Sequence, residues 1–199
     1  IFPLLPALML SIPSVQNVVV DRAAKFASDY LGTKVAVGHI TVGMLNRVAV
    51  RDFYVADIDG DTLLYVKRAD AYIASLASLA KKNLVINYGK VQGGKFVVRE
   101  TERGTFAVKE ITDQLVNRKR KGEFRLDIHS LDGSDIDFSL YRNDEPRDAG
   151  VDYADMHLYD IDTHLDNFVV DRSAVSGDIT RLSFVERSGF VLEDMRGYF

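Results

Sequence analysis

Cysteine is absent from the 199 residues of this chain. Disulfide frameworks, thiolate zinc sites and cysteine nucleophiles all need the sulfur atom, so the sequence excludes them together. The G-x-S-x-G turn of serine hydrolases and the H-E-x-x-H helix of zinc proteases are also absent. Basic charge is not in excess, because 25 Lys and Arg stand against 29 Asp and Glu. Nucleic acid is a poor candidate partner, since phosphate backbones bind clustered basic surfaces. We predict a protein that is not an enzyme and has no metal or cofactor.

Apolar residues make up 47% of the sequence, enough for a folded core. The first twelve residues, IFPLLPALMLSI, carry no charge. A helix needs about 20 apolar residues to cross the hydrocarbon core, so these twelve are too few by themselves. We interpret residues 1–12 as the end of a truncated membrane anchor, with a core or interfacial segment as the alternative.

Residues 13–32 have the pattern of an amphipathic helix. Pro13 can open a helix because its missing N–H would be unpaired in the first turn, and Gly32 stands where a glycine commonly ends one. Apolar residues recur between them at helical spacing. These are Val15, Val18, Val19, Ala23, Phe26, Ala27, Tyr30 and Leu31. The spacing predicts a helix over residues 14–31.

From residue 33 to residue 199 the apolar period changes to 2, which is typical of β-strands. In residues 124–129 (FRLDIH), every second side chain is apolar. Strands with one apolar and one charged face are typical of antiparallel sheets covered on one side. A change of phase after Gly38 indicates a bulge. We predict a mainly β fold with short helices, in which the amphipathic helix precedes an elongated, antiparallel, curled sheet. Residues 117–122 are the predicted point of any subdivision.

Three polar motifs have the spacing of ligand sites but lack essential parts. Residues 89–96 match a phosphate-binding loop until Phe96 replaces the hydroxyl residue that binds magnesium, and we predict a glycine-rich hairpin turn there. Residues 57–61 (DIDGD) lack the later ligands of a calcium loop, which favours an aspartate-rich turn. Residues 160–166 place three aspartates and a histidine on one strand face, which we interpret as a solvated outer surface.

Four phrases follow one another along the chain: SIPSVQ at residues 11–16, LGT at 31–33, VADIDGDTLL at 55–64 and LSFVERSGFVL at 182–192. In this order they resemble the N-terminal region of the TamB family, the translocation and assembly module subunits within the AsmA-like group of envelope proteins. The resemblance implies an inner-membrane anchor and a periplasmic sheet curled into a trough that conducts lipid. It also implies a link to outer-membrane protein assembly through a TamA-like partner, whose binding region is not in this sequence.

These inferences lead to one expected function and one alternative. We expect a single-pass inner-membrane protein, with its bulk in the periplasm, whose apolar β-groove binds phospholipid acyl chains for transport between membranes. The predicted groove residues are Val35, Val37, Val48, Val50, Leu84, Ile86, Phe124, Leu126, Ile128, Ile136, Phe138 and Leu140. A second sheet would cover the same apolar face equally well. The alternative function is a scaffold in outer-membrane protein translocation and assembly, in which a sheet edge templates incoming strands without lipid transfer.

Overall fold

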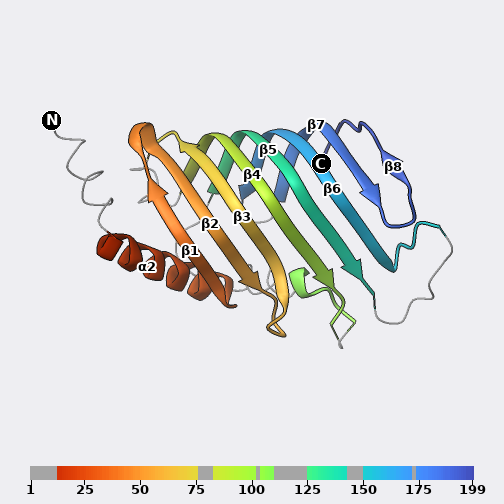
Figure 1. Cartoon of the computed structure of the whole chain (residues 1–199), viewed down its shortest axis with the longest axis horizontal. Coiled ribbons are helices and arrows are strands. Elements are labelled where there is room, and N and C mark those ends of the chain that lie inside the picture. The colour runs from red at the N-terminus through yellow and green to blue at the C-terminus, as the bar shows by residue number, and fades with distance from the viewer. Residues whose placement is uncertain (1–12, 76–82, 102–103, 110–124, 143–149, 172–173) are drawn as a thin grey trace.

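One β-sheet dominates the computed structural model, which describes residues 13–75, 83–101, 104–109, 125–142, 150–171 and 174–199. Strands β1 to β8 lie side by side in sequence order, and β9 also pairs with β7 (Figure 1). The elements are α2 (Pro13–Leu31), β1 (Val35–Val42), η1 (Met44–Asn46), β2 (Arg47–Ala56), β3 (Thr62–Ile73), β4 (Asn83–Arg99), β5 (Arg125–Tyr141), β6 (Asp155–Asp171), β7 (Ala174–Glu186), β8 (Val191–Leu192) and β9 (Gly197–Tyr198). The predicted mainly β fold, with an amphipathic helix leading into an elongated curled sheet, is confirmed.

Helix α2 ends where the sequence predicts, at Gly32. Its N–H donates to the Ser28 carbonyl at 2.8 Å, and its φ of 74° is left-handed, a conformation that glycine adopts without a Cβ clash. The Val35 N–H donates to the Ser28 hydroxyl oxygen at 2.8 Å, and the Thr33 hydroxyl is 3.0 Å from the carbonyl oxygen of Ala56. The end of the helix is therefore joined to the first two strands, and α2 lies beside β1 (Figure 1).

The helix also corrects the expected location. α2 carries Asp21, Arg22, Lys25 and Asp29, and no helix in the described part of the chain is long and apolar enough to cross a membrane. The expected single-pass location in the inner membrane is therefore wrong. The anchor predicted for residues 1–12 lies outside the described residues.

One strand pair departs from the antiparallel expectation. β4 and β5, each 17 residues long, pair in parallel from Asn83 with Arg125 to Arg99 with Tyr141, whereas the other strand pairs are antiparallel. A parallel pair needs a crossover of about a dozen residues or more, and residues 100–124 provide it. The subdivision predicted at residues 117–122 falls in this connection, outside the described residues.

The hairpin turn predicted for residues 89–96 is wrong, because these residues lie within β4. Two of the glycines serve close packing instead of a chain reversal. A Cβ on Gly89 would lie 2.9 Å from Leu131 Cδ1, and one on Gly94 would lie 3.2 Å from Ile136 Cγ1. Larger residues at these positions would collide with side chains of β5, so the glycines let bulky β5 residues pack over β4.

A line of left-handed residues crosses the middle of the sheet. Asp52 of β2, Gly93 of β4 and Asp135 of β5 have φ angles of 52°, 67° and 55°. The strand registers place Gly38 of β1 and Lys67 of β3 in the same line. We call this line of residues (Gly38, Asp52, Lys67, Gly93 and Asp135) the crease. Irregular residues of this kind bend strands and increase their twist, and the strands arch over in Figure 1.

The crease reverses the alternation of side chains. Arg51 and Asp52 are consecutive, yet both line one hollow on the outer surface, as do Lys67 and Arg68. Next to the crease, the opposite parity of residues therefore faces inward on the same strand. On β4 and β5 the parity changes once more, between residues 86 and 89 and between residues 128 and 131. The change of phase predicted at Gly38 is part of this feature: a Cβ there would lie 2.9 Å from the Cβ of Asp52. The reversal keeps one face apolar along the whole length of a bent strand.

Candidate functional site: the concave apolar face

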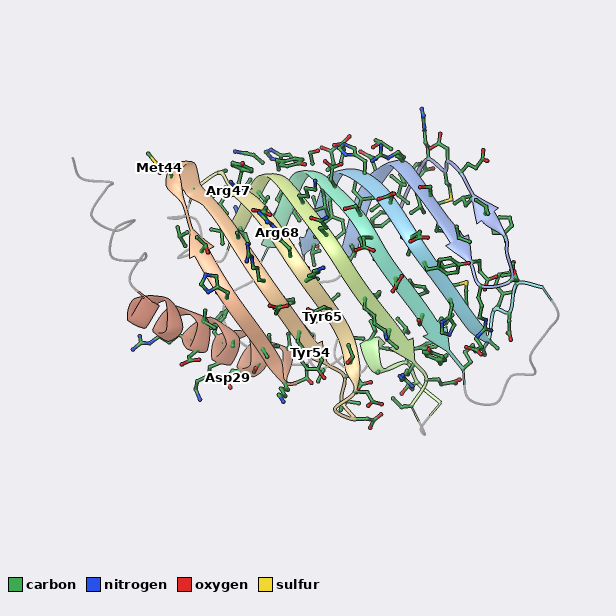
Figure 2. All side chains as sticks on the ribbon, viewed as in Figure 1. Asp29, Met44, Arg47, Tyr54, Tyr65 and Arg68 are labelled. Carbon is green, nitrogen blue, oxygen red and sulfur yellow. The ribbon has the colours of Figure 1, made fainter. Side chains whose placement is uncertain are left out.

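Two rows of apolar residues cross the concave face on one side of the crease. Residues paired in register point to the same face of a sheet. The first row contains Val35, Val55, Leu64, Phe96, Phe138 and Leu158, and the second contains Val37, Phe53, Val66, Gly94, Ile136 and Ile161. The rings of Phe96 and Phe138 have centroids 5.7 Å apart. The opposite, convex face carries the labelled Tyr54, Tyr65 and Arg68 in Figure 2.

Further apolar rows continue on the other side of the crease. They contain Val50, Ala69, Val91 and Gly133, then Val48, Ala71, Gly89, Leu131 and Leu165, and then Ile73, Ile86, Ile128 and Phe168. A Cβ built on Gly89 would point toward Leu131, Ile128 and Ile86, which places these rows on one face. The concave face is thus apolar on both sides of the crease.

The predicted groove residues that the structure describes share this face. Val35, Val37, Val48, Val50, Ile86, Ile128, Ile136 and Phe138 lie in the rows above, and Leu84 pairs with Leu126 and Leu140 with Val98 at the two ends of β5. Phe124 lies outside the described residues. Val35 and Ile128 are buried, whereas the other nine described residues are only partly buried.

A buried cluster lies at the α2 end of the sheet, and Ile73, Ile128 and Ile161 are buried elsewhere on the concave face. Val35, Val55 and Leu63 form a buried cluster, against which Ala27, Leu31, Phe53, Leu64, Phe96 and Val108 pack. Apolar area stabilises a fold by about 25 cal/mol for each Å² removed from water. Because nine of the eleven described groove residues are only partly buried, part of this stabilisation is still available to a bound apolar group.

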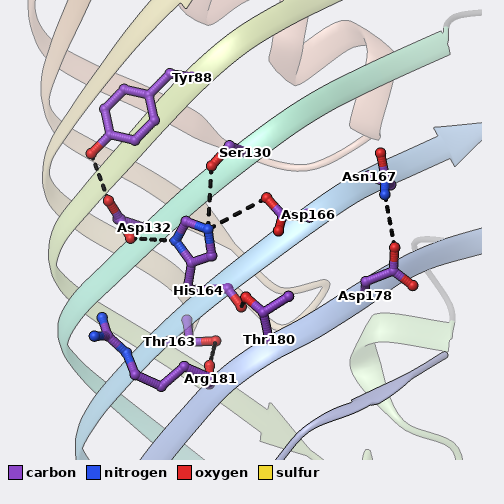
Figure 3. A network of polar contacts seen from close by, with 10 residues as sticks. All are labelled: Tyr88, Ser130, Asp132, Thr163, His164, Asp166, Asn167, Asp178, Thr180 and Arg181. Atoms are coloured by element: carbon purple, nitrogen blue, oxygen red, sulfur yellow. Dashed lines mark hydrogen bonds and ion pairs between the residues drawn. The ribbon is translucent and has the colours of Figure 1, made fainter.

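Polar side chains form a network on the sheet that sequence reasoning missed (Figure 3). The Tyr88 hydroxyl donates to Asp132 Oδ2 at 2.6 Å, and His164 Nδ1 lies 2.6 Å from Asp132 Oδ1. His164 Nε2 lies 3.4 Å from both Ser130 Oγ and Asp166 Oδ1. The hydrogen bond from Tyr88 and then that from His164 lower the pKa of Asp132. The alternation within each strand gave no signal for contacts among three strands.

Ser130, His164 and Asp132 contact one another in the order that serine hydrolases use. The arrangement differs from a catalytic one in two respects. First, Asp166 is as close as Ser130 to His164 Nε2, the nitrogen that would have to accept the serine proton. Second, none of the three residues lines the hollow on the outer surface, where a substrate could bind. We therefore interpret the network as a polar clasp across β4, β5 and β6. This agrees with the interpretation of residues 160–166 as part of an outer polar surface.

Two of the family-like phrases lie at turns. In the β2–β3 turn, Asp57 Oδ1 accepts the N–H groups of Asp59 and Asp61 at 3.0 and 2.8 Å, as predicted for an aspartate-rich turn. Between β7 and β8, the buried Glu186 accepts both the hydroxyl and the N–H of Ser188. The hydrogen bond from the Ser188 hydroxyl lowers the pKa of Glu186. Local turn chemistry explains both phrases.

Comparisons with known proteins do not extend the resemblance. No protein-family model matches the chain, and a search of curated proteins also gave no match. The fold and the candidate site together define a curled single-sheet protein with a partly exposed apolar concave face. Membership of the TamB family stays a prediction from the sequence.

Proposed function

We propose that this protein binds the acyl chains of phospholipids on its concave face and carries them as a non-enzymatic step in lipid transport. One observation carries the proposal: nine of the eleven described groove residues are only partly buried, although all lie on one apolar face. A face of this kind on a folded protein commonly marks a binding surface.

The dimensions of the face suit an acyl chain. Strands lie about 4.8 Å apart, so a row that crosses six strands runs about 24 Å. A hydrocarbon core about 30 Å thick gives each leaflet about 15 Å of chain. One row is therefore long enough for one acyl chain, and the paired rings of Phe96 and Phe138 lie along it.

Photo-cross-linking tests the proposal without introducing a charged residue into the concave face. Benzoylphenylalanine replaces Phe138 in one variant and Asp137, the preceding and exposed residue of β5, in the control. Each purified protein is mixed with phospholipid vesicles and irradiated, and its mass is then measured by mass spectrometry. We expect a phospholipid adduct at position 138 and at least tenfold less at position 137, because neighbours in a strand point to opposite faces. Equal labelling at the two positions, or none at 138, would refute the proposal.

A second candidate function rests on the far edge of the sheet. At this edge, the short strands β8 and β9 both pair with β7. Phe184 of β7 is paired with Leu192 of β8, and Asp178 of β7 is paired with Tyr198 of β9. Val191 and Tyr198 are 54% and 89% exposed. An exposed edge favours pairing with an extended strand, as a scaffold for outer-membrane proteins would need. Binding of a synthetic barrel-strand peptide, but not of its proline-substituted version, would support this alternative.

A further inference from the structure

The crease opens a polar hollow of about 400 Å³ on the outer surface. Its lining residues are Arg51, Asp52, Lys67, Arg68, Gln92 and Asp135. They come from four adjacent strands, and the reversed alternation turns two consecutive residues outward on β2 and again on β3. Gly93 adds space, since a Cβ there would lie 3.0 Å from the Cβ of Lys67. Small-ligand sites commonly have volumes of about 300–1,000 Å³.

Three cations and two carboxylates line this hollow. Arg51 and Arg68 are direct register partners on β2 and β3, and like charges in that position destabilise a sheet. Lys67 adds a third positive charge beside them. The lysines of β4 instead have aspartates of β5 as register partners, Lys90 with Asp132 and Lys95 with Asp137. Three cations thus lie together at the crease, beside the carboxylates of Asp52 and Asp135.

Two of these cations have no carboxylate partner in the described part of the chain. Arg68 pairs with Asp70 at 2.6 Å, whereas no carboxylate described by the structure lies within 4.0 Å of the Arg51 or Lys67 cationic groups. Asp52, the nearest carboxylate in sequence to Arg51, accepts the Tyr65 hydroxyl at 2.7 Å. The guanidinium of Arg51 and the ammonium of Lys67 are therefore available to a ligand.

We propose that the hollow binds a phosphate group that carries neighbouring hydroxyls. Arg51 and Lys67 bind the phosphate oxygens through charge-assisted hydrogen bonds. The carboxylates of Asp52 and Asp135 and the amide of Gln92 accept hydrogen bonds from the hydroxyls, which a bare anion would not supply. A sugar phosphate has this chemistry, and so does the glycerophosphate headgroup of an anionic lipid. The site is separate from the concave face and does not depend on acyl binding.

NMR titration of the full chain tests the site with glucose 6-phosphate as the probe. We expect saturable shifts of the Arg51 side-chain N–H and the Gln92 amide, and no shifts with glucose alone. Arg51→Gln and Lys67→Gln should each weaken binding about tenfold or more, because each removes a charge-assisted hydrogen bond. Lys95→Gln, a cation on the same strand as Gln92 but outside the hollow, is the matched control and should change binding less than twofold.

The melting temperature independently tests the repulsion between Arg51 and Arg68. In phosphate-free buffer of low ionic strength, Arg51→Gln should melt at or above the temperature of the unmodified chain, because it removes one partner of a like-charge pair. A lower melting temperature for Arg51→Gln contradicts the premise. Equal loss of binding in the Lys95→Gln control overturns the proposal, and so does the absence of saturable shifts together with the absence of any vesicle binding that depends on Arg51.

Vesicles identify the source of the phosphate. Binding to phosphatidylglycerol vesicles that Arg51→Gln weakens, with none to phosphatidylcholine vesicles, assigns a lipid headgroup. Binding of glucose 6-phosphate without an Arg51-dependent vesicle interaction assigns a soluble phosphate ester. Failure of both arms rejects the site and leaves acyl binding on the concave face untouched.

Discussion

The two faces of the sheet differ in how their side chains find partners. On the convex face, polar groups satisfy one another: Arg47 and Arg68 share Asp70, and Tyr88 and His164 share Asp132. On the concave face, a buried cluster lies at the α2 end, and nine of the eleven described groove residues are only partly buried. The contrast teaches that the concave face leaves apolar surface partly exposed, whereas the convex face leaves cations such as Arg51 and Lys67 without a carboxylate partner among the described residues.

The largest expected effect separates the covered and open parts of the concave face. Leu63→Ala should lower the free energy of unfolding by about 3 kcal/mol, because Leu63 is in the buried cluster and its truncation leaves a cavity. Leu126→Ala should cost about 1 kcal/mol, since Leu126 is only partly buried. Urea unfolding measures both. Similar losses for the two variants would mean that the open part is packed as well as the core.

A second change breaks the crease, on which both faces depend. Gly38→Ala should cost about 2 kcal/mol, because the new Cβ would lie 2.9 Å from Asp52 Cβ and 3.2 Å from the Arg51 carbonyl oxygen. Gly43→Ala is the matched control, since the nearest atoms to its Cβ are 3.8 Å away, and it should stay within about 0.5 kcal/mol of the unmodified chain. Denaturant unfolding is again the measurement, and a neutral Gly38→Ala would show that the crease tolerates side chains.

A third change tests the ion pairs of the convex face. The hydrogen bond from Arg68, helped by that from Arg47, lowers the pKa of Asp70 to about 2. A lowered carboxyl pKa stabilises the fold above the ordinary value near 4, and this contribution is lost as the pH falls toward 2. Asp70→Asn should therefore cost about 1 kcal/mol at pH 7, discounted because both arginines are 41–45% exposed. The difference from the unmodified chain should shrink as the pH falls through 2 and vanish below it.

The control for this ion pair is Asp194→Asn. Asp194 pairs with Arg196 at 3.1 Å, but both side chains are at least half exposed. Exposed pairs contribute little, so the unfolding curve of this variant should match that of the unmodified chain at every pH. A loss equal to that of Asp70→Asn would mean that general charge balance, and not the Asp70 geometry, explains the effect.

The smallest expected effect concerns the polar clasp. Tyr88→Phe removes one hydrogen bond at a partly buried site and should cost about 0.5 kcal/mol. Since the Tyr88 hydroxyl is the first cause of the lowered pKa of Asp132, the same change should raise that pKa toward its ordinary value. A carboxyl NMR titration follows Asp132 directly. An unchanged pKa would assign the stabilisation of its charged form to His164.

Local signals in the sequence predicted much of this fold. The helix ends at Gly32 because glycine accepts the left-handed conformation there, and residues 57–61 form a turn through Asp57. Alternation also identified which residues share the apolar face. These features depend on neighbours along the chain, which a single sequence displays.

Features that depend on neighbouring strands could not be predicted. The glycines of residues 89–96 have the composition of a turn, but they are required by Leu131 and Ile136 of an adjacent strand. The periodicity of β4 and β5 is the same for parallel and antiparallel pairing, so the sequence does not specify their direction. The polar clasp and the cationic hollow arise from register across three or more strands, which also explains why sequence reasoning missed them.

The parallel pairing of β4 and β5 has a consequence for how the chain folds. Strands β1 to β4 form one meander in which each strand pairs with the next, and β5 to β9 form a second. Contacts within each meander close short loops, whereas the seam between them joins Asn83 to Arg125 across a long connection. Closing longer loops costs more entropy, and non-local pairing slows folding. We therefore expect the two meanders to form first and to dock along this seam in the slowest step, with the N-terminal meander complete before synthesis of the second has ended.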